Sequence, residues 1–307
     1  MKAFSEAPGK VIISGEHFVV HGATALAAAI EKKVKVEATR SDRLEMTSRL
    51  SDPKALLPAR KVVESLYKAK RARPRVSISI VSSIAEGGGL GSSGATMVAV
   101  AGAVSALEGW DTSETALAKA AEPGERLVHG TPSGIDAAAS SYGGVILFSR
   151  GKRPRRLDIK TPVTLLVAVS GKRRNTGKLV SKVSSMKETY PSLFAGLCES
   201  ATLVSSLCAD ALEKADTDTL GRLMTQSHAV LARAGASNKD LDRLVDHCLG
   251  LGCLGAKLTG AGGGGSVLAV PPTGRREATA VARGLQGEGY DVFFTKIPAP
   301  GARVWAD

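Results

Sequence analysis

The sequence has few aromatic residues and no long uncharged apolar stretch. Phe, Trp and Tyr make up 4% of the 307 residues, which is little for a protein that stacks single-stranded bases on aromatic rings. No apolar run approaches the roughly 18 residues that a membrane-spanning helix needs, and the first residues lack the apolar core of a signal peptide. We therefore expect a cytoplasmic protein whose partners are neither nucleic acid nor a membrane.

Cysteine is also scarce, and its spacing disfavours the common cysteine sites. The chain has four cysteines and no Cys-x-x-Cys pair. They are Cys198, Cys208, Cys248 and Cys253. A zinc site or a disulfide framework would show paired spacing, whereas these residues fall at apolar positions of expected helices. We predict four buried free thiols.

Acidic residues are outnumbered by basic ones. The 41 Lys and Arg against 29 Asp and Glu give a formal net charge of +12, which favours acidic partners such as phosphorylated metabolites, nucleic acid or an anionic membrane surface. Two basic clusters, at 71–75 and 152–156, fall in expected loops, where we interpret them as solvated surface. A chain of 307 residues is long enough for two domains, and we place them at 1–158 and 159–307.

Strand and helix patterns are mixed in both halves, which predicts an α+β fold. We expect strands at residues 11–14, 34–39, 76–81, 143–148, 164–169, 256–259, 266–270 and 291–295. We expect helices at residues 53–68, 92–107, 111–122, 176–188, 192–214, 217–234, 238–249 and 275–286, with Asp111 as the cap of the third.

The most informative stretch is a glycine-rich loop between an expected strand and an expected helix. It consists of Gly87, Gly88, Gly89, Leu90, Gly91, Ser92, Ser93 and Gly94. Glycine lets the backbone approach an anion closely, and the N–H groups of the first helical turn favour a phosphate. The spacing also satisfies the dinucleotide pattern GxGxxG, but another helix follows where that fold requires a strand with an acidic end. We therefore predict a phosphate-binding loop of another type.

Two further segments combine charged side chains with irregular backbone. Lys10 precedes a short strand, and Glu16 and His17 follow it. Glu125 and Asp136 flank a stretch rich in Gly, Pro and Ser, so one carboxylate could hold Mg²⁺ while the other meets a substrate hydroxyl. Each segment has an ordinary structural alternative, because Lys10 could be solvent-exposed and Asp136 could cap the helical turn that follows it.

Two more segments lie in the second half. Arg174, Asn175 and Thr176 form a polar triplet whose structural alternative is also a helix cap. Residues 257–265 contain more glycine than a plain hairpin requires. This excess favours a close approach of the backbone to a ligand.

Taken in their order along the chain, these five segments resemble the motifs of the GHMP kinase superfamily and, within it, of the mevalonate kinase family. The resemblance implies an N-terminal domain similar to ribosomal protein S5 domain 2, a ferredoxin-like C-terminal domain and a cleft that holds nucleotide and substrate. It implies ATP-dependent phosphorylation of the 5-hydroxyl of mevalonate to 5-phosphomevalonate, a step in isoprenoid precursor biosynthesis. ATP is then a co-substrate and Mg²⁺ a cofactor, and a homodimer is one assembly that the resemblance allows.

The same resemblance implies a role for each motif residue. Asp136 would be the base on the hydroxyl, and Lys10 would neutralise Asp136 and the developing charge. Magnesium would bind Ser93, with Ser92 beside it, and Glu125. The implied substrate contacts are Glu16, His17, Arg174 and Thr176, and the implied ATP contacts are residues 87–94 with Gly262 and Gly263.

Several alternatives stay open at this point. Because an alcohol is a far weaker acid than a carboxylic acid, Asp136 can accept the proton only late, and Lys10 with the metal is an alternative source of activation. The basic run 172–174 leaves open phosphomevalonate or another small alcohol as substrate. A non-catalytic nucleic-acid-binding module would instead show salt-sensitive binding without turnover.

Overall fold

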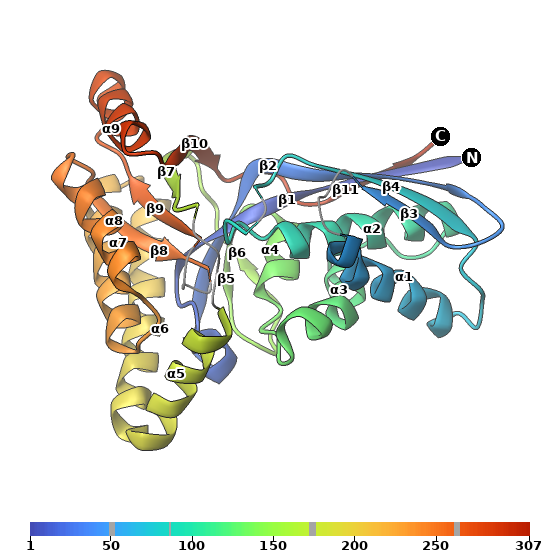
Figure 1. Ribbon diagram of the computed structural model, residues 1–307, viewed down its shortest axis with the longest axis horizontal. Coiled ribbons are helices and arrows are strands. Elements are labelled where there is room, and N and C mark those ends of the chain that lie inside the picture. The colour runs from blue at the N-terminus through green and yellow to red at the C-terminus, as the bar shows by residue number, and fades with distance from the viewer. Residues whose placement is uncertain (49–52, 86, 172–175, 261–264) are drawn as a thin grey trace.

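The computed structural model describes residues 1–48, 53–85, 87–171, 176–260 and 265–307. Within these residues the strands form two sheets, each with helices packed against it (Figure 1). The largest group of contacting buried side chains includes residues of both sheets, among them Leu26, Leu165 and Val270. The expected α+β fold is confirmed.

The first sheet is built mainly from the N-terminal half of the chain. Its strands are β1 (Lys2–Ser14), β2 (Ala25–Arg40), β3 (Glu45–Ser48), β4 (Val76–Ser82), β5 (Val145–Phe148), β6 (Arg155–Arg156) and β11 (Arg303–Ala306). Five of them lie in the order β11-β1-β2-β4-β3, while β5 pairs with β2 and β6 pairs with β5. Because β11 pairs with β1, the end of the chain returns to the first sheet. The domain boundary between residues 158 and 159 stays a prediction.

Helices cover one face of this sheet (Figure 1). They are α1 (Leu57–Ala69), α2 (Ser92–Glu108), α3 (Glu114–His129) and α4 (Ile135–Tyr142), and short 3-10 helices lie at η1 (Phe18–His21) and η2 (Pro53–Leu56). The central helix α2 contacts β1 and β2 and is buried on nearly all sides, as its small apolar residues predict. A Cβ at Gly102 would lie 2.5 Å from Ser5 Oγ, so glycine is what permits this close approach of helix to sheet.

The second sheet lies in the C-terminal half and has the strand order β10-β7-β9-β8. Its strands are β7 (Val163–Val169), β8 (Gly255–Thr259), β9 (Ser266–Val270) and β10 (Asp291–Ile297). The helices of this half are α5 (Thr176–Thr189), α6 (Pro191–Glu213), α7 (Thr217–Arg233), α8 (Lys239–Gly250) and α9 (Arg275–Gly287). Helices α7 and α8 pack on β8 and β9, α6 packs along α7, and α9 packs on β10.

Several predicted boundaries were wrong. Strands β1 and β2 start well before residues 11 and 34, and β3, β6 and β11 were not expected. Helix α3 continues through Pro123 to His129, and Gly124 allows it to pack where a Cβ would lie 2.6 Å from the Pro58 carbonyl oxygen. The cap of α3 is Ser113, whose Oγ accepts a hydrogen bond from the Ala116 N–H; Asp111 instead binds Ser113.

The cysteines are free thiols, as expected. Cys208, Cys248 and Cys253 are buried and Cys198 is half-buried, but Cys253 lies in the turn after α8 and not in a helix.

The expectation about apolar runs needs a correction. By length and composition α6 is apolar enough to cross a membrane, and 39% of its most apolar window is buried. Three acidic residues are spread along this helix, so it contains no long uninterrupted apolar run although its mean hydropathy is high. Helix α6 contacts α5, α7, β1 and β2, so one part of its surface packs against the rest of the protein.

Candidate active site

Lys10 is held by an irregularity in the pairing of β1 with β2. The register shifts between Pro8 and Lys10, at Gly9. A Cβ at Gly9 would lie 2.7 Å from the Leu90 carbonyl oxygen, so glycine lets β1 approach the glycine-rich loop. The Lys10 N–H donates to that carbonyl at 2.8 Å. Such bulges commonly redirect a side chain next to a functional site.

The Lys10 side chain joins the glycine-rich loop to Asp136. Its Nζ lies 3.2 Å from Asp136 Oδ1 and donates to the Gly89 carbonyl at 3.0 Å. The Lys10 side chain is 3% exposed and that of Asp136 is 26% exposed, so the alternative of a solvent-exposed lysine was wrong. A Cβ at Gly91 would lie 2.8 Å from Lys10 Cγ, which explains a glycine at that position of the loop.

Asp136 is the second residue of α4, whose cap is Gly134, so the alternative of Asp136 as a helix cap was wrong. Helix α4 lies close to the start of α2. A Cβ at Gly94 would lie 2.9 Å from Asp136 Cβ, so glycine permits this close approach. The fold therefore brings the glycine-rich loop and the Asp136 carboxylate, which are far apart in the sequence, close together.

Glu125, on α3, lies beside this pair. It is 2% exposed, and its Oε1 accepts a hydrogen bond from the Ala137 N–H at 3.1 Å. Burial and the nearby charge of Asp136 raise the pKa of Glu125 to about 7. Within the part of the chain that the structure describes, its Oε2 is buried and has no hydrogen-bond partner. A buried carboxylate oxygen without a donor is costly, and a bound cation would relieve that cost.

The described residues fit a magnesium ion that also binds phosphate. They include no group of three or more His, Cys, Asp or Glu side chains that could hold a metal alone. Mg²⁺ usually takes one or two carboxylates and completes its shell with phosphate oxygens and water. Glu125 Oε2 could supply the carboxylate, and Ser92 and Ser93, both half-buried at the start of α2, could supply hydroxyls.

Glu16 lies just beyond β1 and is fully enclosed. Lys257, on β8, forms an ion pair with Glu16 Oε1, and the two side chains are 0% and 2% exposed. Burial raises the pKa of Glu16 and lowers that of Lys257, while the charge of each opposes the shift of the other. His17 follows with a backbone φ of 62°, a left-handed conformation that is costly for a residue with a Cβ.

Strand β8 is bonded to β1 close to Lys10. Thr259 Oγ1 accepts from the Ile12 N–H at 2.9 Å, and Lys257 Nζ donates to the Ile12 carbonyl at 3.1 Å. Ser266, at the start of β9, donates to the Gly88 carbonyl at 2.6 Å. The strand before the glycine-rich segment of the second sheet therefore lies against β1, and the strand after it contacts the glycine-rich loop of the first half.

Some predicted site residues cannot be placed. Arg174, Asn175, Gly262 and Gly263 lie outside the described residues. Thr176 begins α5, and nothing is described of its side chain.

Three contact residues were not assigned a role from the sequence: Lys257, Thr259 and Ser266. One signal was available, because Lys257 is a lone cation inside the otherwise uncharged strand of residues 255–259. A charge in a buried strand needs a buried partner, but the sequence does not show which one.

The arrangement combines groups that phosphoryl transfer requires: backbone N–H groups at a glycine loop and helix start, a buried cation, a carboxylate at the mouth and a second carboxylate for a metal.

The chain is similar to known proteins. The model of the GHMP kinases N terminal domain matches residues 58–144, and that of the GHMP kinases C terminal matches residues 208–291. The chain is 36% identical to a mevalonate kinase of Aeropyrum pernix, with 98% of both chains covered. It is 34% identical to a mevalonate kinase of Pyrococcus furiosus, over 99% of this chain and 98% of the relative. The crystal structure of L. major mevalonate kinase in complex with R-mevalonate superposes with a TM-score of 0.83 at 28% identity, covering 96% of each chain. The chain belongs to the GHMP kinase family.

Proposed function

We propose that this protein transfers the γ-phosphoryl group of ATP to the 5-hydroxyl of mevalonate. The observation that carries the proposal is the contact of one buried ammonium, Lys10 Nζ, with both the phosphate-binding loop at Gly89 and the carboxylate of Asp136. The full-length relatives with 36% and 34% identity support mevalonate as the substrate.

The glycine-rich loop would bind the phosphates. Its backbone and the N–H groups at the start of α2 favour an anion, and Gly91, with φ of 75°, ends the loop as the cap of α2. Gly262 and Gly263 would also contact the phosphates, and the contact of nearby Ser266 with Gly88 supports this.

Magnesium would be held by Glu125 and by the hydroxyls of Ser92 and Ser93. When bound, the ion neutralises phosphate charge and fixes the geometry of the phosphates. The buried and unpartnered Oε2 of Glu125 in the described structure supports this assignment.

Lys10 and Asp136 would act on the reacting hydroxyl. Asp136, at the mouth of the site, orients the hydroxyl and takes its proton as the bond to phosphorus forms. Lys10 fixes the position of Asp136 and offsets the negative charge that develops on the transferred group. Most of the catalysis then comes from positioning and charge, as is usual for phosphoryl transfer.

Glu16, His17, Arg174 and Thr176 would bind mevalonate. Support comes from the position of Glu16 and His17, which directly follow the strand that carries Lys10. The unpartnered buried Oε2 of Glu16 in the described residues suits a hydroxyl donor of the substrate. The proposal includes a cytoplasmic location and no nucleic-acid partner, and a homodimer stays a prediction.

The test measures ADP release from ATP and Mg²⁺ with mevalonate, phosphomevalonate, homoserine, galactose and shikimate offered separately. We expect turnover selective for mevalonate that is lost in Asp136→Ala. Turnover with another alcohol would retain the mechanism and replace the substrate. Absence of turnover together with salt-dependent binding of DNA or RNA would contradict the enzyme assignment.

A further inference from the structure

A large cavity is lined in part by Glu125 and by no residue of the glycine-rich loop. It has a volume of about 1000 Å³ and is formed by α3, α4, the segment 130–134 between them and the connection of β5 to β6 at 149–154. Figure 1 shows these elements next to one another below the first sheet. A cavity of this size accommodates a small organic ligand.

The rim of the cavity is strongly cationic. Five cations line it, against the two carboxylates of Glu122 and Glu125. They are Lys119, Arg126, Arg150, Lys152 and Arg153. Arg126 lies 3.7 Å from Glu122, and the other four form no ion pair with any residue that the structure describes. Unpaired charges of one sign around a recess concentrate its positive potential and attract anions.

The floor of the same cavity is apolar. Ala138, Tyr142 and Phe148 line it, and the last two are only 7% and 6% exposed. The Tyr142 hydroxyl is already paired with Thr115 Oγ1 at 2.7 Å, so the ring presents an apolar face without an unmet polar group. The cavity therefore combines a cationic rim with an aromatic floor.

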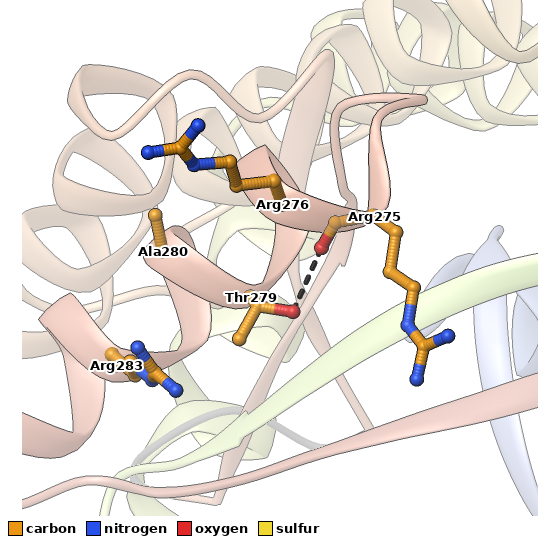
Figure 2. Close-up of a pocket in the computed structure, with 5 residues that line it drawn as sticks. All are labelled: Arg275, Arg276, Thr279, Ala280 and Arg283. Atoms are coloured by element: carbon orange, nitrogen blue, oxygen red, sulfur yellow. Dashed lines mark hydrogen bonds between the residues drawn. The ribbon is translucent and has the colours of Figure 1, made fainter.

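Another arginine cluster on the protein lacks the aromatic floor of this cavity. Arg275, Arg276 and Arg283 surround a shallow recess of about 670 Å³ whose lining comes from α9 alone. Figure 2 shows their side chains extending in different directions from the helix, and the Thr279 hydroxyl is bonded to the Arg275 carbonyl at 2.7 Å. We interpret this cluster as solvated surface, and it provides a matched control.

We propose that the cavity between α3, α4 and the β5–β6 connection binds an organic phosphate, with the phosphate among the cations of the rim and the apolar part on Tyr142 and Phe148. Of the catalytic groups assigned above, only Glu125 lines this cavity, and no residue of the 87–94 loop does. The cavity therefore shares Glu125 with the proposed magnesium site but no residue with the proposed phosphate-binding loop, and we expect both ligands to be bound at once.

The experiment titrates inorganic phosphate and phenyl phosphate into the full-length protein by calorimetry, with and without a saturating non-hydrolysable ATP analogue and Mg²⁺. Two triple variants remove the same charge: R150Q/K152Q/R153Q at the cavity and R275Q/R276Q/R283Q on α9. All six positions are on the surface, and thermal unfolding checks that each variant folds.

We expect phenyl phosphate to bind at least tenfold more tightly than inorganic phosphate, and to bind equally well when the ATP analogue is present. The cavity variant should lose at least tenfold in affinity, and the α9 variant should bind like the wild type. Equal losses in both variants would show an unspecific effect of net charge and overturn the proposal. Displacement of phenyl phosphate by the ATP analogue would also overturn it, because the ligand would then occupy the nucleotide site.

Discussion

The ammonium of Lys10 lies 3.2 Å from the carboxylate of Asp136, although 126 positions separate the two residues in the sequence. The contact requires a glycine bulge in β1, a helix start at Gly134 and a loop whose Gly89 carbonyl accepts a second hydrogen bond from the same ammonium. A buried cation that contacts both the proposed phosphate-binding loop and the proposed base is the centre of the site.

Replacing Lys10 tests the role of its charge. Lys10→Met keeps the apolar stem and removes the ammonium, and we expect turnover to fall by about 100-fold to 1000-fold, the usual effect of losing one charge-stabilising donor. Steady-state rates with saturating ATP and mevalonate measure it. Lys33→Met, which breaks the ion pair with Glu6 on the same sheet, is the control and should retain wild-type turnover. Equal losses in both variants would contradict a catalytic role for Lys10.

Glu125 should make stability depend on pH. Its pKa is about 7 in the folded protein and ordinarily 4.5, so between these values the folded protein binds more protons than the unfolded chain. Stability contributed by the protonated form is present below pH 4.5 and is lost as pH rises through about 7. A shift of this size corresponds to about 3 kcal/mol.

The comparison is urea unfolding of the wild type and Glu125→Gln at pH 5 and pH 8, without divalent metal. We expect the free energy of unfolding of the wild type to fall from pH 5 to pH 8 relative to that of Glu125→Gln. Glu122→Gln, one turn earlier on the same helix and exposed, is the control and should follow the wild type. An identical pH dependence in Glu125→Gln and wild type would show that Glu125 ionises normally.

Lys257 should be important for stability because its partner is buried. Lys257→Met leaves the Glu16 carboxylate without its counter-charge, and removing one partner of a buried pair typically costs about 3 to 5 kcal/mol. The double variant Glu16→Gln with Lys257→Met should recover part of that loss. Urea unfolding of both variants measures it. Lys2→Met, which breaks the exposed pair with Glu37, should have little effect on stability, because solvent screens a surface pair. A loss in Lys257→Met no larger than that of Lys2→Met would contradict this account.

Substitutions at two glycines of the loop distinguish the effect of backbone strain from the effect of contact with Lys10. Gly87 and Gly91 both have left-handed φ angles, of 72° and 75°. Alanine at either position should cost about 1 to 2 kcal/mol in conformational strain. Only at Gly91 would the new Cβ meet Lys10, at 2.8 Å from Cγ, since nothing lies within 4 Å at Gly87.

We therefore expect turnover to fall about tenfold further in Gly91→Ala than in Gly87→Ala, because small displacements of catalytic groups are costly. Steady-state kinetics with thermal unfolding of both variants separates the two effects. Equal turnover in the two variants would show that the position of Lys10 does not depend on Gly91.

Local patterns in the sequence were sufficient for the elements that depend on local chemistry. The strand before the glycine loop and the helix that starts at Ser92 were predicted within one residue, because glycine and the serines define the junction. The start of β2 was missed, since the run of residues 25–30 is mostly alanine and is buried on both faces, which removes the alternation that marks a strand.

Contacts between residues far apart in the sequence could not be predicted, for a different reason. Glu16 and Lys257 are 241 positions apart, and only the packing of β8 on β1 brings them together. The same holds for β11, whose pairing with β1 joins the two ends of the chain. The roles of individual residues came from their resemblance to a family, and the geometry now supplies contacts through which Lys10, Glu125 and Asp136 can act.

We propose that Asp136 and Lys10 direct the phosphoryl group to the 5-hydroxyl of mevalonate. The most direct measurement follows transfer of a labelled γ-phosphoryl group from ATP in a single turnover, with the product identified by mass spectrometry, in the wild type and Asp136→Asn. The account predicts 5-phosphomevalonate in the wild type and a rate at least 100-fold lower in the variant. Wild-type rates in Asp136→Asn, or a phosphate on another hydroxyl, would contradict it.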